Sequence, residues 1–76
     1  MGDAERAELE RRVRAGEWLQ VGDVAELLDV ARKTVDRRIT DGQIGVRTKA
    51  GGTWRLCDPA DVIRLLDESR LTRRGE

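Results

Sequence analysis

A basic stretch in the middle of the chain holds side chains suited to bind a negatively charged partner. Residues 30–44 read VARKTVDRRITDGQI, and four cations fall within seven positions: Arg32, Lys33, Arg37 and Arg38. Lysine and arginine bind DNA phosphates and also reach guanine edges in the major groove, and threonine bonds to bases or phosphates. Thr34 and Thr40 belong to the same stretch. The alternative is an ordinary solvated surface helix.

The order of residues around a helix separates a buried face of this stretch from an exposed one. At about 100° per residue, Ile39 lies about 40° and Gly42 about 20° from Val35, so all three should face the core. The opposite side, roughly 140–200° away, presents two cations and a hydroxyl, flanked by a second hydroxyl and one carboxylate: Lys33, Arg37, Thr40, Thr34 and Asp36. Such a face suits DNA, although a pair between Asp36 and Arg32, four residues apart, would suit a solvated helix.

Composition confines the chain to a few classes of protein. It has 76 residues, enough for one small domain, and no apolar segment long enough to span a membrane. One cysteine and no histidine leave no disulfide framework and no Cys/His zinc site within the chain. Because a phosphate-binding loop and a base that could activate Cys57 are also missing, we expect no catalysis and no cofactor. The single cysteine fits a reducing, cytoplasmic setting. Arginine outnumbers lysine 13 to 2, which is typical of GC-rich genomes, so we expect a protein encoded by a bacterium or a phage.

The net charge is zero, but the charges are spread unevenly along the chain. Residues 1–29 hold eight acidic and four basic side chains, residues 30–57 hold two and seven, and residues 58–76 hold five and four. The central segment, with a net charge of +5, can therefore form one basic face between acidic flanks. For DNA binding, the distribution of charge matters more than its sum.

Local signals predict four helices joined by short segments. An acidic helix covers residues 3–15, and a second helix spans GDVAELLDV, where apolar residues recur at a helical period. The basic helix follows over about 32–41. A glycine, which ends a helix readily, follows both the first and the third helix. The last helix lies in DPADVIRLLDESR, where Asp58 can cap it and Pro59 suits its first position.

The segment IGVRTKAGGTWRLC predicts a two-stranded β-hairpin with its turn at Gly51 and Gly52. Alternate side chains of a strand share a face. The expected inward set is apolar: Ile44, Val46, Trp54 and Leu56. The outward set then consists of three cations on one side of the ribbon: Arg47, Lys49 and Arg55. A ribbon of this kind fits beside a phosphate backbone, unless it is an ordinary charged solvent face.

Two short helices joined by a short turn, then a hairpin and a helix, form the order of a winged helix-turn-helix. The segments LQVGDVAELLDVARKTVDRRITDGQI and RTKAGGTWRLCDPADVIRLL, within about residues 18–67, resemble this module in the MerR superfamily. The nearest branches are the small excisionases and the short single-domain actinobacterial regulators. We therefore expect a mainly α fold with a small β-hairpin: an acidic N-terminal helix over 1–17, a DNA-binding domain over 18–70 and a frayed tail over 71–76.

The resemblance implies a sequence-specific double-stranded DNA-binding protein, with a recognition helix in the major groove and a basic wing on the backbone. Its role is either transcription regulation or excision, with RNA polymerase or an integrase as the protein partner. The chain ends about ten residues past Leu66, so we expect no dimerising coiled coil, no small-molecule effector, and a monomer that binds DNA as neighbouring copies. The acidic helix around Glu5, Glu8 and Glu10 meets a neighbouring copy, shields the protein's own core, or docks a protein partner as an adaptor.

Some positions depart from the usual pattern of the family. Ala31 stands where a serine or threonine usually caps the recognition helix, and losing such a cap costs about 1 kcal/mol. Arg38 replaces a tryptophan or leucine, so its stem should pack at the edge of the core while its head reaches phosphate. Thr53 and Trp54 replace a His-Arg pair, which removes one expected phosphate contact. The other tryptophan, Trp18, is expected to lie in the core between the N-terminal segment and the last helix.

Overall fold

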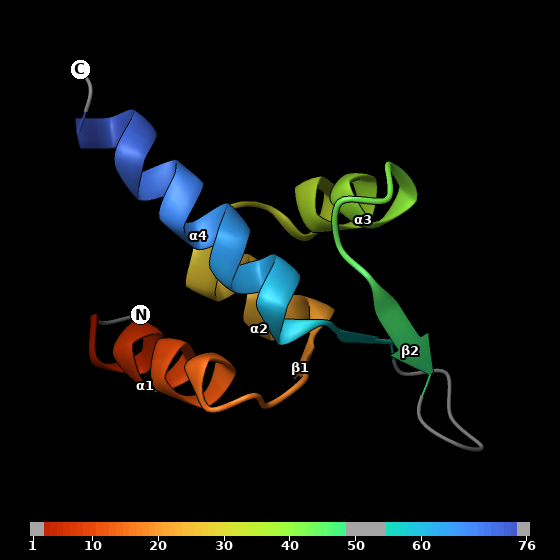
Figure 1. Cartoon of the computed structure of the whole chain (residues 1–76), viewed down its shortest axis with the longest axis horizontal. Helices are drawn as coiled ribbons and strands as arrows, with labels where there is room; N and C mark the ends of the chain where they lie inside the picture. The colour runs from red at the N-terminus through yellow and green to blue at the C-terminus, as the bar shows by residue number, and fades with distance from the viewer. Residues whose placement is uncertain (1–2, 49–54, 75–76) are drawn as a thin grey trace.

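The computed structural model describes residues 3–48 and 55–74, with side chains described for residues 4–48 and 55–70 (Figure 1). Within these ranges the chain forms four helices and a small three-stranded antiparallel sheet. The elements are α1 (Asp3–Arg14), β1 (Leu19–Gln20), α2 (Val21–Leu28), α3 (Arg32–Thr40), β2 (Val46–Thr48), β3 (Arg55–Cys57) and α4 (Pro59–Arg74). The prediction of a mainly helical chain with a small β element is confirmed. None of these helices is long and apolar enough to cross a membrane.

Several helix ends follow from local chemistry, as the sequence predicts. Gly16 after α1 and Gly42 after α3 have positive φ angles of 94° and 82°, which glycine adopts without steric cost. α4 begins with Pro59, and the Asp58 carboxylate accepts a hydrogen bond of 2.9 Å from a backbone N–H in the first turn. α4 stays helical through Arg74, beyond the residue at which we expected a frayed tail to begin.

A turn of three residues, Asp29–Ala31, joins α2 to α3. Asp29 closes α2 in the left-handed conformation, with φ 59° and ψ 47°, which short polar side chains tolerate better than most. Ala31, the residue before α3, has an extended backbone and offers no side-chain oxygen to the first turn of the helix. α2 and α3 therefore pack against each other across a tight turn, and α3 starts without a side-chain cap.

The sheet has three strands rather than the two that the sequence predicts. Its order is β1-β3-β2, so β3 lies in the middle and pairs with both neighbours in antiparallel register. The strand that the sequence did not predict, β1, is only two residues long, which is too short to show an alternating pattern. β1 ties the hairpin to the segment that leads directly into α2.

The predicted assignment of the hairpin faces is correct for Ile44, which is buried, but wrong for the residues of the two strands. Directly paired residues of an antiparallel ladder project to the same face, and here Arg47 pairs with Leu56 while Thr48 pairs with Arg55. Arg47 and Arg55 therefore lie on opposite faces, and Leu56 does not share the face of Val46. The reason is that Cys57, fully buried, sets the inward phase of β3, whereas Val46 remains 39% exposed. Two further residues of that assignment, Lys49 and Trp54, lie outside the described residues.

The core combines residues from all four helices with parts of the sheet. Its most buried members are Val13, Leu19, Val24, Val35, Ile44, Cys57 and Val62. Leu9 and Val13 bring α1 into this core, so the acidic helix is an integral part of the domain. The core position expected for Trp18 is wrong, because this residue is only partly buried and lies under the Arg47 guanidinium, 4.2 Å from the ring centroid.

Two sets of polar contacts hold the outer elements to α4. Glu10 of α1 accepts hydrogen bonds from Arg14, at 2.9 Å, and from Arg70 of α4, at 3.0 Å. These two arginines lower the pKa of the Glu10 carboxyl, with the Arg70 hydrogen bond as the larger cause. In the first turn of α4, Asp61 accepts a hydrogen bond of 2.8 Å from the Gly45 N–H, which fixes the start of the hairpin. α3 and β2 thus lie at the end of the molecule away from α1 (Figure 1).

Candidate nucleic-acid interface

The helical phase predicted for α3 is confirmed by burial. Val35 is fully buried and Ile39 packs against the core, whereas Lys33, Arg37 and Thr40 are exposed on the other side. Gly42 is also exposed, and the prediction that it faces the core is wrong, because the helix ends before it and the chain turns away. The exposed side of α3 therefore forms one stripe, with cations one turn apart.

Three cations of α3 have no partner among the described residues. Arg32, Lys33 and Arg37 are exposed and make no hydrogen bond or ion pair with any of them. Arg32 and Lys33 also lie in the first turn of α3, where the helix dipole disfavours positive charge and no acidic residue balances them. This face is consequently electropositive, and an anion would relieve the unfavourable charge arrangement.

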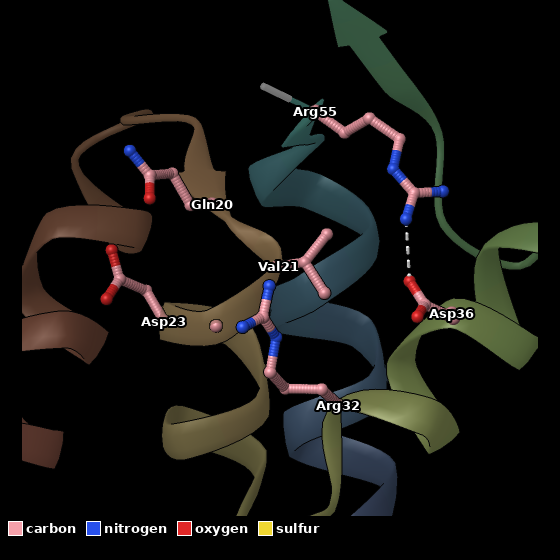
Figure 2. Close-up of a pocket in the computed structure, with 7 residues that line it drawn as sticks. Gln20, Val21, Asp23, Arg32, Asp36 and Arg55 are labelled. Carbon is pink, nitrogen blue, oxygen red and sulfur yellow. Dashed lines mark hydrogen bonds and ion pairs between the residues drawn. The ribbon is translucent and has the colours of Figure 1, made fainter. Parts of the chain in front are cut away.

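Asp36 interacts with the hairpin rather than with its own helix. Its Oδ1 atom accepts a hydrogen bond of 2.8 Å from Arg55 of β3, so the pair with Arg32 that the sequence offered is not the one formed (Figure 2). This contact joins the two elements for which the sequence predicted nucleic-acid contacts. The contact also neutralises part of the charge of Arg55, so Arg55 differs from Arg32, Lys33 and Arg37, which have no partner among the described residues.

A hollow of about 360 Å³ lies where α3, β3 and the start of α2 meet (Figure 2). Asp36 and Arg55 line one side of it, and Arg32 extends from the start of α3 toward α2. The remaining lining residues come from the end of β1 and the first turn of α2: Gln20, Val21, Gly22 and Asp23. Sequence reasoning missed this contribution, although the first turn of a helix that precedes a basic helix offers backbone N–H groups near the same surface.

Two predicted site residues turn toward α4 instead. Thr34 and Arg38, one turn apart, line a second hollow of about 350 Å³ together with apolar residues that include Leu65 of α4. The Arg38 guanidinium donates a hydrogen bond of 3.0 Å to the side chain of Gln43. The expectation that the Arg38 stem packs beside the core agrees with this position. Thr34 and Arg38 are thus separated from the stripe of Lys33 and Arg37.

The hairpin brings only part of its predicted basic face to the site. Arg55 borders the α3 hollow, whereas Arg47, on the opposite face of the ribbon, lies over Trp18. Lys49 lies outside the described residues. Trp18 is a contact that the sequence did not predict, because its partner lies 29 positions away on another element.

Cys57 lies behind this surface and is fully buried. Burial raises the pKa of its thiol to about 11, and the nearby Arg55 offsets this only in part. The thiol is therefore protonated at neutral pH and is a packing residue rather than a nucleophile.

Comparisons of the chain with family models, with curated proteins and with solved structures found no match. The family resemblance therefore stays a prediction, and the arrangement of residues around α3 is the feature of the molecule that points to a function.

Proposed function

We propose that this chain is a sequence-specific double-stranded DNA-binding protein that acts as a winged helix-turn-helix. In this proposal α2 and α3 form the helix-turn-helix, and the β2–β3 hairpin is the wing. The observation that carries it is the stripe of exposed cations on α3, opposite the buried Val35, which have no partner among the residues that the structure describes. Lys33 and Arg37 enter the major groove. Of the hairpin cations that the sequence predicted to contact phosphates, Arg55 borders the α3 surface and contacts the same duplex, whereas Arg47 lies on the opposite face of the ribbon.

Several features of the charge distribution support a polyanionic ligand. Glu8 and Glu10 of α1 are paired with arginines of the same chain, so these carboxylates do not compete for the cations of α3. The starts of α2 and α3 also lack a side-chain cap, at Gln20 and Ala31, which leaves helix N–H groups available to phosphate oxygens. Basic residues at α3 and uncapped helix starts together give an anion several donors on one surface.

The biological role follows from the proposed resemblance to small excisionases and single-domain MerR-like regulators. As a transcription regulator, the protein would act with RNA polymerase; as an excisionase, it would bend DNA and steer an integrase. Both roles use the same module, and both are served by neighbouring copies on DNA, because one module of this size buries only about 600–1,000 Å² of protein surface. Analytical ultracentrifugation should find a monomer, and titration onto duplexes with one, two and three sites should reveal cooperative filling. Independent filling, or a stable dimer without DNA, contradicts this assembly.

A role as a protein-interaction adaptor through the acidic helix is the weaker candidate. Glu8 pairs with Arg11 within α1, and Glu10 bridges Arg14 and Arg70. These pairs favour an acidic helix that completes the protein's own fold over one that offers free carboxylates to a partner or to the wing of a neighbouring copy.

Selection from a pool of randomised duplexes, followed by anisotropy measurements across a salt series, tests the proposal. We expect an enriched motif and an affinity that falls linearly with salt on a logarithmic scale, with a slope near −0.9 per phosphate contact. Amide shift mapping on the enriched duplex should perturb residues 32–40. No enrichment and no salt dependence, or a silent α3, would overturn the proposal.

A further inference from the structure

A carboxylate lies on the basic side of α3, and an arginine of the hairpin holds it in place. Asp36 and Arg55 are 19 residues apart in the sequence, and the hydrogen bond between Arg55 Nη2 and Asp36 Oδ1 measures 2.8 Å (Figure 2). The two side chains are 47% and 48% exposed, for Arg55 and Asp36 respectively, so a ligand can reach both. On the neighbouring positions of α3, Lys33 and Arg37 have no partner among the described residues.

This ion pair affects the geometry of Asp36 more than the stability of the fold. Exposed pairs add little to the free energy of unfolding, because water screens the charges and two long side chains lose conformational freedom. The pair does, however, direct one carboxylate oxygen of Asp36 toward Arg55. The other oxygen, Oδ2, has no hydrogen-bond partner among the described residues and remains available to a donor.

We infer that Asp36 reads a cytosine in the major groove and that Arg55 positions its carboxylate for this contact. The inference rests on the proposed DNA binding. A carboxylate close to DNA is repelled by the phosphates, so it opposes binding unless a hydrogen-bond donor of the DNA faces it. Arg55 offsets part of the negative charge of Asp36, and Oδ2 of Asp36 accepts a hydrogen bond from the exocyclic amino group of the base.

The chemistry of the base edges selects cytosine for this contact. Guanine presents two acceptors in the major groove, and thymine presents an acceptor and a methyl group, so neither can donate to a carboxylate. Adenine presents an amino donor beside the N7 acceptor, and N7 would be repelled by the negatively charged carboxylate of Asp36. Cytosine presents the N4 amino donor without an acceptor. The guanine paired with it, or the next one, suits the donors of Lys33 and Arg37.

The decisive experiment selects binding sites from randomised duplexes with three full-length proteins: wild type, Asp36→Ala and Asp36→Asn. For wild type we expect one motif position with a cytosine preference of about fivefold or more over the other bases. Asp36→Ala should remove the preference at that position alone. Asp36→Asn should change it to adenine, because an asparagine amide both accepts and donates and can bond to N6 and N7 of adenine.

The Arg55 substitutions test the positioning role through the cytosine preference, which would not change if Arg55 only contacted a phosphate or stabilised the hairpin. Arg55→Ala should weaken the cytosine preference at the Asp36 position and also lower affinity for all sequences, whereas Arg55→Lys should restore part of the preference. If Arg55→Ala lowers affinity and leaves the cytosine preference at full strength, the positioning role is overturned. Thermal unfolding of each variant should remain close to wild type, which confirms that the proteins compared are folded.

The outcomes separate this inference from the proposal beneath it. If wild type enriches no motif, DNA recognition itself fails and the cytosine contact fails with it. If wild type enriches a motif that Asp36→Ala and Asp36→Asn leave unchanged, DNA binding stands and the cytosine contact is wrong. Loss of a preference for a base other than cytosine in Asp36→Ala also overturns it.

Discussion

The α1–α4 side of the molecule and the α3–hairpin side use the same residue types in different ways. On the α1–α4 side, arginines find carboxylates: Glu10 bridges Arg14 and Arg70, and Arg14 also reaches Asp67. On the α3 side, Arg32, Lys33 and Arg37 have no such partner within the described residues. A chain with equal numbers of acids and bases thus distributes its ion pairs unevenly over its surface.

This difference shows why net charge is a poor guide to ligands. Carboxylates near α1 neutralise their arginines locally and help to dock one helix on another. Arg32, Lys33 and Arg37 of α3 gain no such interaction from the described part of the chain, so in the proposed function they contact the bound DNA. The pair of Asp36 and Arg55 lies between these extremes, since it joins two elements on the surface that we propose to bind DNA.

The largest expected effect concerns the exposed cations of α3. Lys33→Ala and Arg37→Ala should each weaken DNA binding by about 1–3 kcal/mol where a base contact is lost, with little change in the free energy of unfolding. Anisotropy measures the first quantity and chemical denaturation the second. The matched control is Arg11→Ala, which removes the same type of charge from the exposed side of α1. Equal losses of affinity for Arg11→Ala and Arg37→Ala would abolish the distinction between the two sides.

A second test compares the starts of two helices. Asp58 caps α4, whereas Ala31 leaves α3 uncapped. Ala31→Ser should raise the free energy of unfolding by about 1 kcal/mol, and Asp58→Ala should lower it by a similar amount. Urea denaturation at neutral pH measures both changes. No stabilisation in Ala31→Ser would show that the start of α3 is already satisfied in another way.

A third test addresses the hairpin. Arg47→Ala removes the cation–π contact with Trp18, so it should cost about 0.5–1 kcal/mol of stability. If Arg47 also contacts a phosphate, affinity should fall equally on all sequences and the salt slope should flatten by about one unit. A change in sequence preference with an unchanged salt slope would instead identify Arg47 as a base-reading residue.

The smallest expected effect lies in the paired network. Hydrogen bonds from Arg70 and Arg14 lower the pKa of Glu10 below its ordinary value of 4.5. A carboxyl with a lowered pKa in the folded state contributes stability above pH 4.5, and this contribution is lost as the pH falls through the folded-state pKa. Glu10→Gln should therefore cost less than about 1 kcal/mol at pH 7 and make stability less sensitive to acid. An acid unfolding curve identical to wild type would show that Glu10 does not stabilise the fold.

Much of the local structure could be predicted because short-range chemistry decides it. Counting 100° per residue from Val35 predicted which face of α3 is buried, and the exposed positions of Lys33 and Arg37 followed from it. Glycine at a left-handed position and the Asp58–Pro59 pair marked helix ends, since caps depend on residues within one turn. The exposed cations of α3 were thus predictable from consecutive residues.

Tertiary structure decided the features that depend on distant residues. In β3 the side chain that faces the core is Cys57 rather than Leu56. Packing against residues from several elements decides this, and the two short strands carry too few apolar residues for the sequence to show which face is buried. The contact of Asp36 with Arg55 links residues that the sequence keeps apart, and so does that of Arg47 with Trp18. The sequence by itself determined the charge of each residue and which face of each helix is buried. The residue with which each charged side chain pairs depends on which elements the fold brings within hydrogen-bonding distance.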